Sequence, residues 1–424
     1  MVRHAAAVTG VAVVVVATLS GLLGPISASG ASGTTQGVTA TTIRLGIPYV
    51  DVAAVRAVGV NIDWGNVPDA FEAIIADMNA HGGINGRRVV PYILAVNPTG
   101  PAAAATACTK LTQDDQVFAA IAPLEPTCYL QNGVPVVGAI LAESGSKGTP
   151  QNFTVTPPQA AYDPLQLSVF AKQGVFRHKK VGIFAGTESD VPEVQVVQSA
   201  LAKLHVQVVT TGVDSAPQGD LAASNQQVTA IAQRFESDGA NEVVAVGNGS
   251  AIWPQGLSAI QSSYNPPWVA TSESDLSGEV AGDNNPTYLT NMVTSSPLTP
   301  PQAIWDNAGT QKCVHTVRKA YPSDKISPYG STIPASHATW MGVELACTDL
   351  ALFATIAKAA GKHLTVSSFV EAGYGIRNAV VPGTNAPVSF APGRPYALGP
   401  VYMVHYDAGT KSLVFSTKSA AERD

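Results

Sequence analysis

The 424-residue sequence is poor in charge, because Asp, Glu, Lys and Arg together make up 13% of its residues, against about 25% in ordinary soluble domains. Its 24 Lys and Arg residues are outnumbered by 30 Asp and Glu residues, which gives a net charge of −6. Proteins that bind nucleic acid through its phosphates, or a membrane through a polybasic surface, need the opposite balance. The composition argues against both classes, while the 46% hydrophobic content predicts a folded chain with a sizeable core.

The sequence also lacks the motifs of common enzymes. It contains no G-x-S-x-G elbow, no H-E-x-x-H zinc motif, no Walker loop and no G-x-G-x-x-G that opens a helix. Its eight His residues are scattered without pairing. An active site assembled from distant residues would leave no motif, so an exported hydrolase remains an alternative. No cofactor and no metal are expected.

Cysteine is scarce, with four residues and none before Cys108, which excludes a lipid-modified N-terminal cysteine. The even number, the missing C-x-x-C pair and the missing His at metal-ligand spacing favour disulfides over a metal or redox site. Three connectivities are possible. We expect the sequential one, Cys108 with Cys128 and Cys313 with Cys347, and buried free thiols are the alternative.

One hydrophobic run near the N-terminus reads as an export signal. Arg3 precedes the uncharged stretch Ala5–Leu23, and small residues follow, as a signal-peptidase site requires. We expect residues 1–30 to be a signal peptide. Retention as a membrane anchor is the alternative, because the stretch could just span a bilayer. No second span follows, so we expect the mature protein to be soluble, and secreted or located in the periplasm or cell envelope.

Downstream of this run, short apolar strands alternate with helical patterns. Ile43–Tyr49 has the period of a strand, and Phe71–Met78 has the period of a helix that ends before Gly82. Similar patterns predict strands at 89–95, 117–122, 134–140, 181–184, 206–213, 242–246 and 268–271, and helices at 101–111, 162–169, 194–204, 228–235 and around 257. The alternation predicts parallel sheets flanked by helices, and its restart after Pro157 predicts two α/β lobes.

The remaining third of the chain is less regular. Residues 275–334 are rich in Pro, Asn, Ser and Thr, and we expect a loop with one helix around 314–321. A helical pattern over 335–360 stops at Gly361. Residues 401–406 and 413–416 are expected to form a hairpin.

Three segments carry a resemblance to a known family. They are Ile43–Pro48, the run Asn79–Arg87 (N-A-H-G-G-I-N-G-R) and Lys110–Val117 (K-L-T-Q-D-D-Q-V). They resemble the type I periplasmic binding proteins, and in particular the branched-chain amino-acid (Leu/Ile/Val) binding proteins of ABC transporters. Weaker similarity extends over nearly all of Thr41–Phe415.

The resemblance implies two Rossmann-like lobes with mainly parallel sheets, joined by a three-stranded hinge with crossings near Val155, Thr294 and Ser389. Lobe 1 would then comprise residues 41–155 plus 295–388, and lobe 2 residues 156–294 plus 389–424. The implied function is an extracytoplasmic solute-binding protein, a monomer that captures an amino acid or related compound for an ABC transporter permease. A sensor or scavenger of the same fold is the alternative.

Candidate ligand residues are those that follow the strands, because parallel sheets bind ligands beyond the carboxyl ends of their strands. These segments are rich in carboxylates and hydroxyls, and only Arg56 and Lys147 nearby are basic. The candidates are Glu125, Thr127, Glu143, Ser144, Asn248 and Glu273. The resemblance implies that Thr127 and Ser144 lie near the hydroxyls that hold a ligand carboxylate, and that Glu273 receives its amino group.

Two departures from the family pattern argue against an aliphatic amino acid as the ligand. Glu125 and Glu143 stand where the family usually has small residues, and Ser189-Asp190 replaces an aromatic-Gly pair. The alternative role of such loop residues is solvent exposure or helix capping. Two tryptophans, Trp64 and Trp253, could line the ligand cleft or belong to the core.

Overall fold

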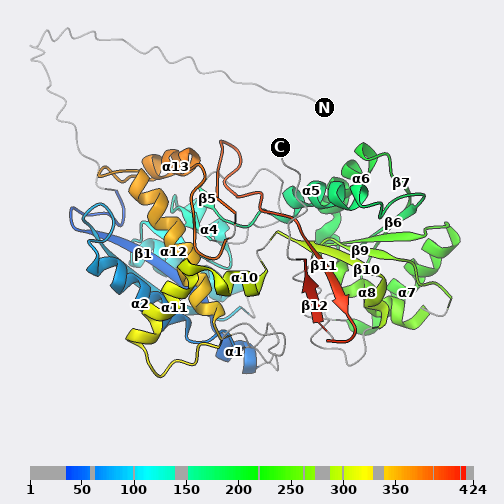
Figure 1. The fold of residues 1–424 in the computed structure, drawn as a ribbon, viewed down its shortest axis with the longest axis horizontal. Coiled ribbons are helices and arrows are strands. Elements are labelled where there is room, and N and C mark those ends of the chain that lie inside the picture. The colour runs from blue at the N-terminus through cyan, green and yellow to red at the C-terminus, as the bar shows by residue number, and fades with distance from the viewer. Residues whose placement is uncertain are drawn as a thin grey trace, which may run out of the picture. The chain divides into compact units, whose positions relative to one another are not determined.

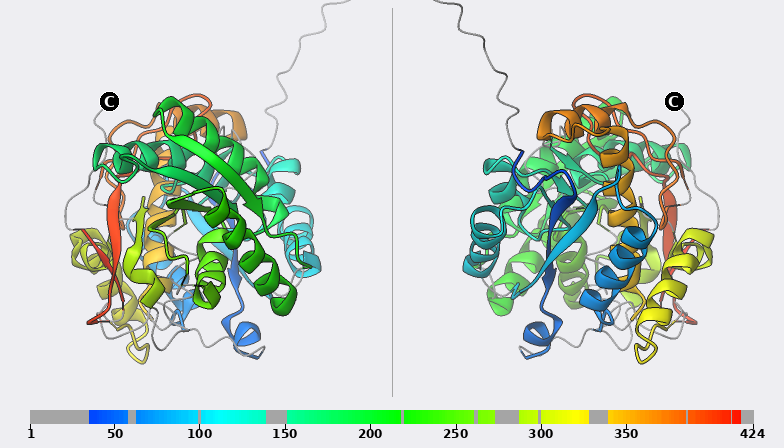
Figure 2. Two further views of the ribbon diagram at one scale, coloured as in Figure 1. Left: turned by 90° about the vertical axis from the view of Figure 1, so that its right-hand side faces the viewer. Right: turned by 90° about the vertical axis from the view of Figure 1, so that its left-hand side faces the viewer.

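The computed structural model describes residues 35–57, 63–98, 101–138, 151–217, 220–260, 263–272, 287–297, 300–327, 339–384, 386–410 and 412–416. These residues form two β-sheets flanked by helices (Figure 1, Figure 2). Neighbouring strands are parallel, except in the pairs that involve the last two strands of the chain. The structure therefore confirms the α/β fold of two mainly parallel sheets.

The first sheet has five strands in the order β2-β1-β3-β4-β5. They are β1 (Thr42–Val50), β2 (Arg88–Val96), β3 (Ala119–Ile121), β4 (Val136–Val137) and β5 (Asn152–Phe153). The sequence predicted the first four. It missed β5, because two residues are too few to show a periodic pattern.

Helices cover both faces of this sheet. Ile43, Leu45 and Ile47 of β1 share one core with α2, α11, α12 and α13, whereas Ala120 and Val136 pack with α3 and α4 on the other face. This division follows from the two-residue period of a strand. The helices are α1 (Val52–Ala57), α2 (Val67–Ala80), α3 (Pro101–Thr109) with the π-turn η1 (Lys110–Asp114), α4 (Pro126–Gln131), α10 (Pro301–Asp306), α11 (Ala308–Ala320), α12 (Met341–Ala359) and α13 (Val366–Gly375).

The second sheet has seven strands in the order β12-β11-β10-β9-β8-β6-β7. They are β6 (Lys180–Ala185), β7 (Gln207–Val213), β8 (Glu242–Val246), β9 (Trp268–Ala270), β10 (Met292–Ser296), β11 (Tyr402–Asp407) and β12 (Ser412–Phe415). Ile183 and Val244 pack with α5 and α6, whereas Phe184 and Val243 pack with α7 and α8. The elements between these strands are α5 (Gln159–Lys172), η2 (Glu188–Asp190), α6 (Val191–Lys203), α7 (Leu221–Ser237), α8 (Gly249–Ile260) and η3 (Thr287–Asn291).

Residues 275–334 hold more regular structure than the expected loop with one helix. Strand β10 lies in this stretch and pairs with β9 and β11, and helix α10 follows it. Its sequence M-V-T-S-S resembles a loop because three of its five residues carry hydroxyls. The structure satisfies these groups: the Thr294 hydroxyl donates to the Ala270 carbonyl (2.7 Å) and the Ser295 hydroxyl to Gln166 Oε1 (2.9 Å).

The chain passes between the two sheets three times. After β5 it enters α5, and after β10 it returns to α10 and the helices of the first sheet. Phe390 and Ala397 still belong to the core of the first sheet, and β11 then joins the second. Thr154 forms a parallel bridge with Tyr396, so that two of these connecting segments lie side by side.

The run Asn79–Arg87 joins β2, the end of α12 and the segment before β1. The Asn79 side chain exchanges two hydrogen bonds with the backbone of Val89, both 2.8 Å. Asn85, in the left-handed region at φ 50°, donates its amide to three carbonyls at the C-terminal end of α12 (2.9–3.3 Å). Arg87 donates to the carbonyls of Thr39 and Lys362, both at 2.7 Å. The run that carries the resemblance therefore has a structural role.

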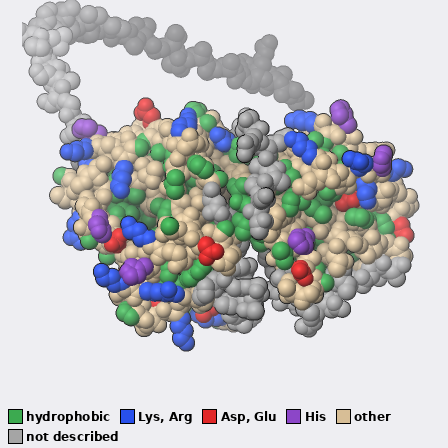
Figure 3. Space-filling model, in the orientation of Figure 1, with side chains coloured by type: hydrophobic (Ala, Val, Ile, Leu, Met, Phe, Trp, Pro, Cys, Tyr) green, Lys and Arg blue, Asp and Glu red, His purple; other side chains and the backbone are tan. Residues whose placement is uncertain are grey.

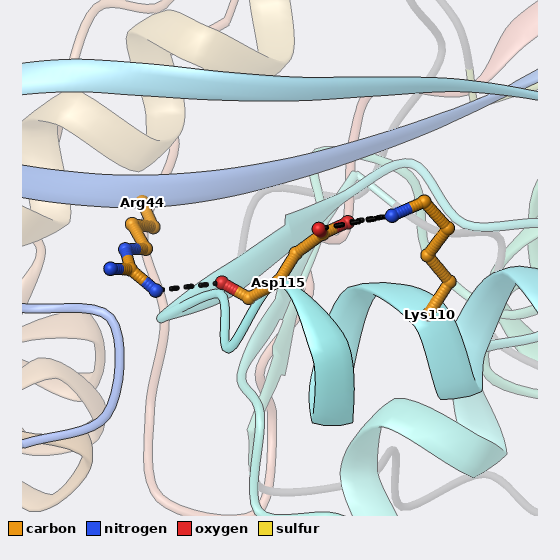
Figure 4. A network of polar contacts seen from close by, with 3 residues as sticks. All are labelled: Arg44, Lys110 and Asp115. Carbon is orange, nitrogen blue, oxygen red and sulfur yellow. Dashed lines mark hydrogen bonds and ion pairs between the residues drawn. The ribbon is translucent and has the colours of Figure 1, made fainter.

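The segment Lys110–Val117 also fixes the first sheet. The Lys110 ammonium lies 3.0 Å from the Asp115 carboxylate, and the Arg44 guanidinium of β1 donates to the Asp115 carbonyl at 3.1 Å (Figure 4). The contact from Arg44 ties the turn after η1 to β1.

Both expected disulfides are present. Cys108 bonds to Cys128, with their Cα atoms 6.3 Å apart, and Cys313 bonds to Cys347, with 6.0 Å between their Cα atoms. The first joins α3 to α4 and the second joins α11 to α12.

The expected signal peptide, residues 1–30, lies outside the described residues. Among the residues that the structure describes, no helix combines the length and hydrophobicity of a membrane span. Charged side chains are scattered over the face in Figure 3 among many apolar and uncharged ones, in keeping with the low charge of the sequence.

Candidate functional site

Polar residues follow three neighbouring strands of the second sheet. Strands β6, β8 and β9 are parallel, so their carboxyl ends lie at the same edge. The Gly247 N–H donates to the Thr271 hydroxyl (3.0 Å), which donates in turn to Glu193 Oε1 (3.1 Å). The Asn248 amide lies 3.4 Å from Asp190 Oδ1. We call Asp190, Glu193, Asn248 and Thr271 the second-sheet cluster.

Glycines allow the loops of this cluster to approach one another. A Cβ at Gly186 would lie 2.4 Å from the backbone nitrogen of Gly249. Gly247 has φ +53°, and a Cβ there would lie 2.8 Å from Asp190 Oδ1 and 3.4 Å from Glu193 Oε2. Both carboxylates therefore converge on one glycine that ends β8.

The carboxyl groups of this edge are buried. Asp163 and Asp190 are 0% exposed and Glu193 is 4% exposed. Burial raises the pKa of Asp190, and hydrogen bonds from Thr187 and Asn248 oppose that rise. Asp190 also forms a capping box with Thr187 at the start of η2. Asp190 therefore takes part in capping at the N3 position of η2, with Thr187 as the N-cap residue, and its side chain does not cap α6 as an N-cap residue would. Asn248 is the exposed member of the cluster.

A second set of amides holds the end of β9. Gln159 and Gln166 of α5 each donate both to Asp163 Oδ1 (2.7 and 2.8 Å) and to the Thr271 carbonyl (2.7 and 3.0 Å). The edge is thus rigidly built from hydrogen-bonded polar groups, which suits recognition of a polar ligand.

The corresponding edge of the first sheet carries Glu125 and Thr127 at the start of α4. Both are exposed. Glu125 occupies the N-cap position of α4, but its side chain accepts no hydrogen bond from the backbone of that helix. Glu125 therefore does not cap α4. Leu124 beside it is 40% exposed, which is unusual among the large apolar side chains that the structure describes.

Strand β4 ends at the same edge against a buried carboxyl group of α12. Gly138, at φ +85°, follows β4, and a Cβ there would lie 2.3 Å from Asp349 Cγ. Asp349 is 4% exposed, and its Oδ2 atom has no hydrogen-bond partner among the described residues. Across the described ranges no group of three or more His, Cys, Asp or Glu side chains could hold a metal ion.

Comparison with known families agrees with this architecture. The family model described as "periplasmic binding protein" matches residues 64–411. The chain belongs to the periplasmic binding protein family. No curated protein matches it significantly.

Solved structures of other periplasmic binding proteins share the fold at low sequence identity. An ABC transporter substrate-binding protein from Desulfitobacterium hafniense, in complex with Leu, is 13% identical (TM-score 0.60; 88% of this chain and 100% of that chain covered). A fatty acid ABC transporter substrate-binding protein from Thermomonospora curvata is 15% identical (TM-score 0.60; 92% and 94%). LivJ from Streptococcus pneumoniae, in complex with isoleucine, is 14% identical (TM-score 0.57; 89% and 100%).

The structure of this periplasmic binding protein places three of the six expected ligand residues. Glu125, Thr127 and Asn248 are exposed at the carboxyl edges of their own sheets. Glu143, Ser144 and Glu273 lie outside the described residues, and so does Lys147. The ligand roles of all six residues stay a prediction.

The two tryptophans differ in their surroundings. Trp253 is fully buried, with its ring 5.2 Å from Phe184 and 5.7 Å from Phe235, so it belongs to the core and does not line a cleft. Trp64 is half-buried against the core of the first sheet.

The sequence did not indicate that Asp163 and Glu193 belong to the polar carboxyl edge of the second sheet. Asp163 lies in α5 and Glu193 in the first turn of α6, and acidic residues of helices are ordinarily exposed to solvent. Their burial depends on Gly247, Thr271 and Gln166, which belong to distant parts of the sequence. Pro192, directly before Glu193, marks the start of α6, and this was the only local signal of where the side chain lies.

Proposed function

We propose that this protein is an extracytoplasmic solute-binding protein that captures a small molecule between two lobes and delivers it to an ABC importer. Family membership, the two mainly parallel sheets and the polar residues at their carboxyl edges support this proposal. The protein recognises its solute by closing its two lobes about a hinge, and no covalent bond is made or broken.

One observation carries the choice of ligand class, namely the acidic second-sheet edge. Asp163, Asp190 and Glu193 are buried there, and Glu273 follows β9 in the sequence. An anionic ligand would meet like charge at this edge, whereas a cationic group would be stabilised by it. We therefore propose an amino acid or related compound with a cationic group. The solutes of the relatives, leucine, isoleucine and a fatty acid, show that this fold accommodates varied chemistry.

The contacts that we propose are divided between the lobes. Thr127 and Ser144 hold the ligand's anionic end from lobe 1, with Glu125 and Glu143 beside them. Glu273 receives the cationic group from lobe 2, and Asn248 contributes its exposed amide.

The lobe boundaries also remain a proposal. The crossings expected from the sequence lie near Val155, Thr294 and Ser389. We propose that the chain crosses between the lobes close to these positions, and the sheet and core memberships support crossings just after Phe153, Ser296 and Ala397. We further propose that the signal peptide is removed and that the protein acts outside the cytoplasm as a monomer.

A ligand-induced melting screen on the exported protein tests the function. The panel contains neutral, basic and aromatic amino acids, amides, polyamines and aromatic acids. A compound at one hundred times its Kd should stabilise the protein by about 2.7 kcal/mol. If no compound raises the Tm and one is instead turned over, the binding function is wrong and the hydrolase alternative stands.

A matched pair of variants locates the site. Asn248→Ala removes the exposed amide of the second-sheet cluster, whereas Asn225→Ala removes an exposed amide from the surface of α7. We expect the first to weaken binding of the screened compound several-fold and the second to leave it unchanged. Equal effects of the two variants would place the ligand elsewhere.

A further inference from the structure

The contact between Asp349 and Gly138 links a buried acid to the carboxyl edge of the first sheet. All three atoms of the Asp349 carboxyl group would lie within 2.4 Å of a Cβ at Gly138, so the group packs directly on the glycine. Gly138 is the first residue after β4. Movement of this carboxyl group toward Gly138 is therefore blocked, and movement away from it removes a contact at the end of β4.

Two backbone hydrogen bonds connect that end to its neighbours. The Gly138 N–H donates to the Phe153 carbonyl of β5 (2.9 Å), and the Ala122 N–H donates to the Val137 carbonyl of β4 (2.8 Å). Phe153 directly precedes the crossing to the second sheet, and Ala122 precedes the segment of Glu125 and Thr127. The carboxyl ends of β3, β4 and β5 are thus joined by hydrogen bonds next to Gly138, on which Asp349 packs.

The surroundings of Asp349 favour its neutral form. Burial raises the pKa of Asp349 well above its usual range, and the carboxylate of Glu344 raises it further. The pKa of Glu344 itself is raised to about 7 by burial, although a hydrogen bond from the Thr348 hydroxyl opposes the rise. That hydroxyl lies 3.1 Å from Glu344 and 2.9 Å from the Pro382 carbonyl.

Among the residues that the structure describes, no basic side chain neutralises an ionised Asp349. Helix α12 packs against β4, α2, α11, α13 and the segment after α13, and it also contacts Trp64 and Asn85. Strand β4 has no titratable residue, and α12 itself adds Lys358 to Glu344 and Asp349. The charged or titratable groups of the other elements are Asp69, Glu72, Asp77, Lys312, His315, Arg318, Lys319, Glu371, Tyr374 and Arg377. Arg377 is engaged by the carbonyls of Tyr374, Ile376 and Phe390, and of all charged groups described Glu344 alone shifts the titration of Asp349.

We propose that Asp349 is a proton-dependent positioning residue: with its proton it holds the carboxyl end of β4 through Gly138, and without it this edge of the first sheet loosens. An ionised carboxylate without a partner is strongly disfavoured in a buried site, and it is relieved by turning toward water. When the carboxylate turns away, Gly138 loses the side chain that packs against it. The consequence for solute capture rests on the proposed function, whereas the loosening of the edge does not.

Hydrogen exchange of the ligand-free exported protein between pH 5.5 and pH 9 tests the proposal. After correction for intrinsic exchange, we expect the protection of the Ala122 and Gly138 amides to fall at least tenfold toward high pH. Asp349→Asn keeps the shape without the charge, so it should abolish this dependence and retain full protection. Glu344→Gln removes the neighbouring charge and should move the midpoint to lower pH.

The matched control is Glu242→Gln, which removes a buried carboxyl group from the second sheet. It should leave the pH dependence at Ala122 and Gly138 unchanged. Protection in the wild-type protein that does not vary with pH would overturn the proposal, even if Asp349→Asn failed to fold. So would a dependence that survives in Asp349→Asn. Because no ligand is present, failure here is separate from failure of the melting screen.

Discussion

Glu242 shows how a single buried carboxyl group makes the stability of this protein depend on pH. It begins β8, is 2% exposed, and its carboxylate lies 3.3 Å from the Lys179 ammonium. Burial raises its pKa from 4.5 to about 7, although the charge of Lys179 lowers it. The folded state therefore holds a proton that the unfolded state has lost, and this group's contribution to stability falls as pH rises from about 4.5 to about 7.

Replacing this carboxyl group should remove that dependence. A rise in pKa from 4.5 to about 7 corresponds to about 3 kcal/mol. We expect the unfolding free energy of Glu242→Gln, relative to wild type, to increase by up to about 3 kcal/mol between pH 4 and pH 8. Urea unfolding at both pH values measures it. Glu236→Gln, on exposed α7 surface, should show no such change, and a constant difference for Glu242→Gln would contradict the prediction.

Glu273 is the residue on which the proposed ligand class depends most. If it pairs with a cationic group inside a closed site, Glu273→Gln should weaken binding about tenfold or more, because a charge-assisted contact contributes roughly 1.5–3 kcal/mol. The Tm of the ligand-free protein should change little. Calorimetry with the compound from the melting screen measures both the affinity and its enthalpy.

The capping alternative for Glu273 predicts the opposite pair of results. The ligand-free protein would lose roughly 0.5–2 kcal/mol of stability, while the affinity stayed the same. An unaltered Kd would move the acidic partner to another candidate, with Glu125 or Glu143 tested next by the same substitution.

Among the elements, α12 depends on a side chain from far away in the sequence. Asn85 closes the C-terminal end of α12 through three carbonyls and adopts φ 50°. Asn85→Ala loses the hydrogen bonds and strains the backbone, so the unfolding free energy should fall by about 2–3 kcal/mol. Asn85→Gly loses the bonds but tolerates the backbone angle, so it should cost less. Equal losses for the two variants in urea unfolding would show that the angle contributes nothing.

The two disulfides fasten helices that pack on the first sheet. Cys108–Cys128 spans 20 residues and Cys313–Cys347 spans 34. On the chain-entropy model each stabilises the fold by roughly 3–4 kcal/mol. Replacing either pair by serines should lower the unfolding free energy by that amount, and peptide mapping without reduction should recover the two sequential pairs. A peptide that joins Cys128 to Cys347 would refute the connectivity.

At the level of elements, periodic patterns located most helices and strands, and the failures have a physical cause. Strand β5 is two residues long, and β10 carries hydroxyls whose partners, the Ala270 carbonyl and Gln166, lie on other elements. A pattern within one segment cannot reveal bonds that a distant segment supplies. The same reason explains why Glu193 and Asp163 were not recognised as members of the polar edge.

For the whole molecule, the alternation of strands and helices and the run Asn79–Arg87 predicted two α/β units and the correct family. The side chains at the strand ends were less predictable. Asp349 meets Gly138 from more than two hundred residues away in the chain, and nothing near either residue indicates the contact. Burial of such acids is a property of the assembled fold.

Three connecting segments between the sheets make closure about a hinge the expected motion of the whole molecule. Solute bound to both lobes should favour a closed form, because it gains contacts there that an open form lacks. X-ray scattering of the exported protein should therefore show a smaller radius of gyration with the screened compound at saturation. The same compound added to Glu273→Gln, at a concentration that saturates wild type but not the variant, should give a smaller change. An unchanged radius of gyration in a sample that calorimetry shows to be saturated would mean that the protein captures its solute without closing, and the delivery step would then need a signal other than lobe position.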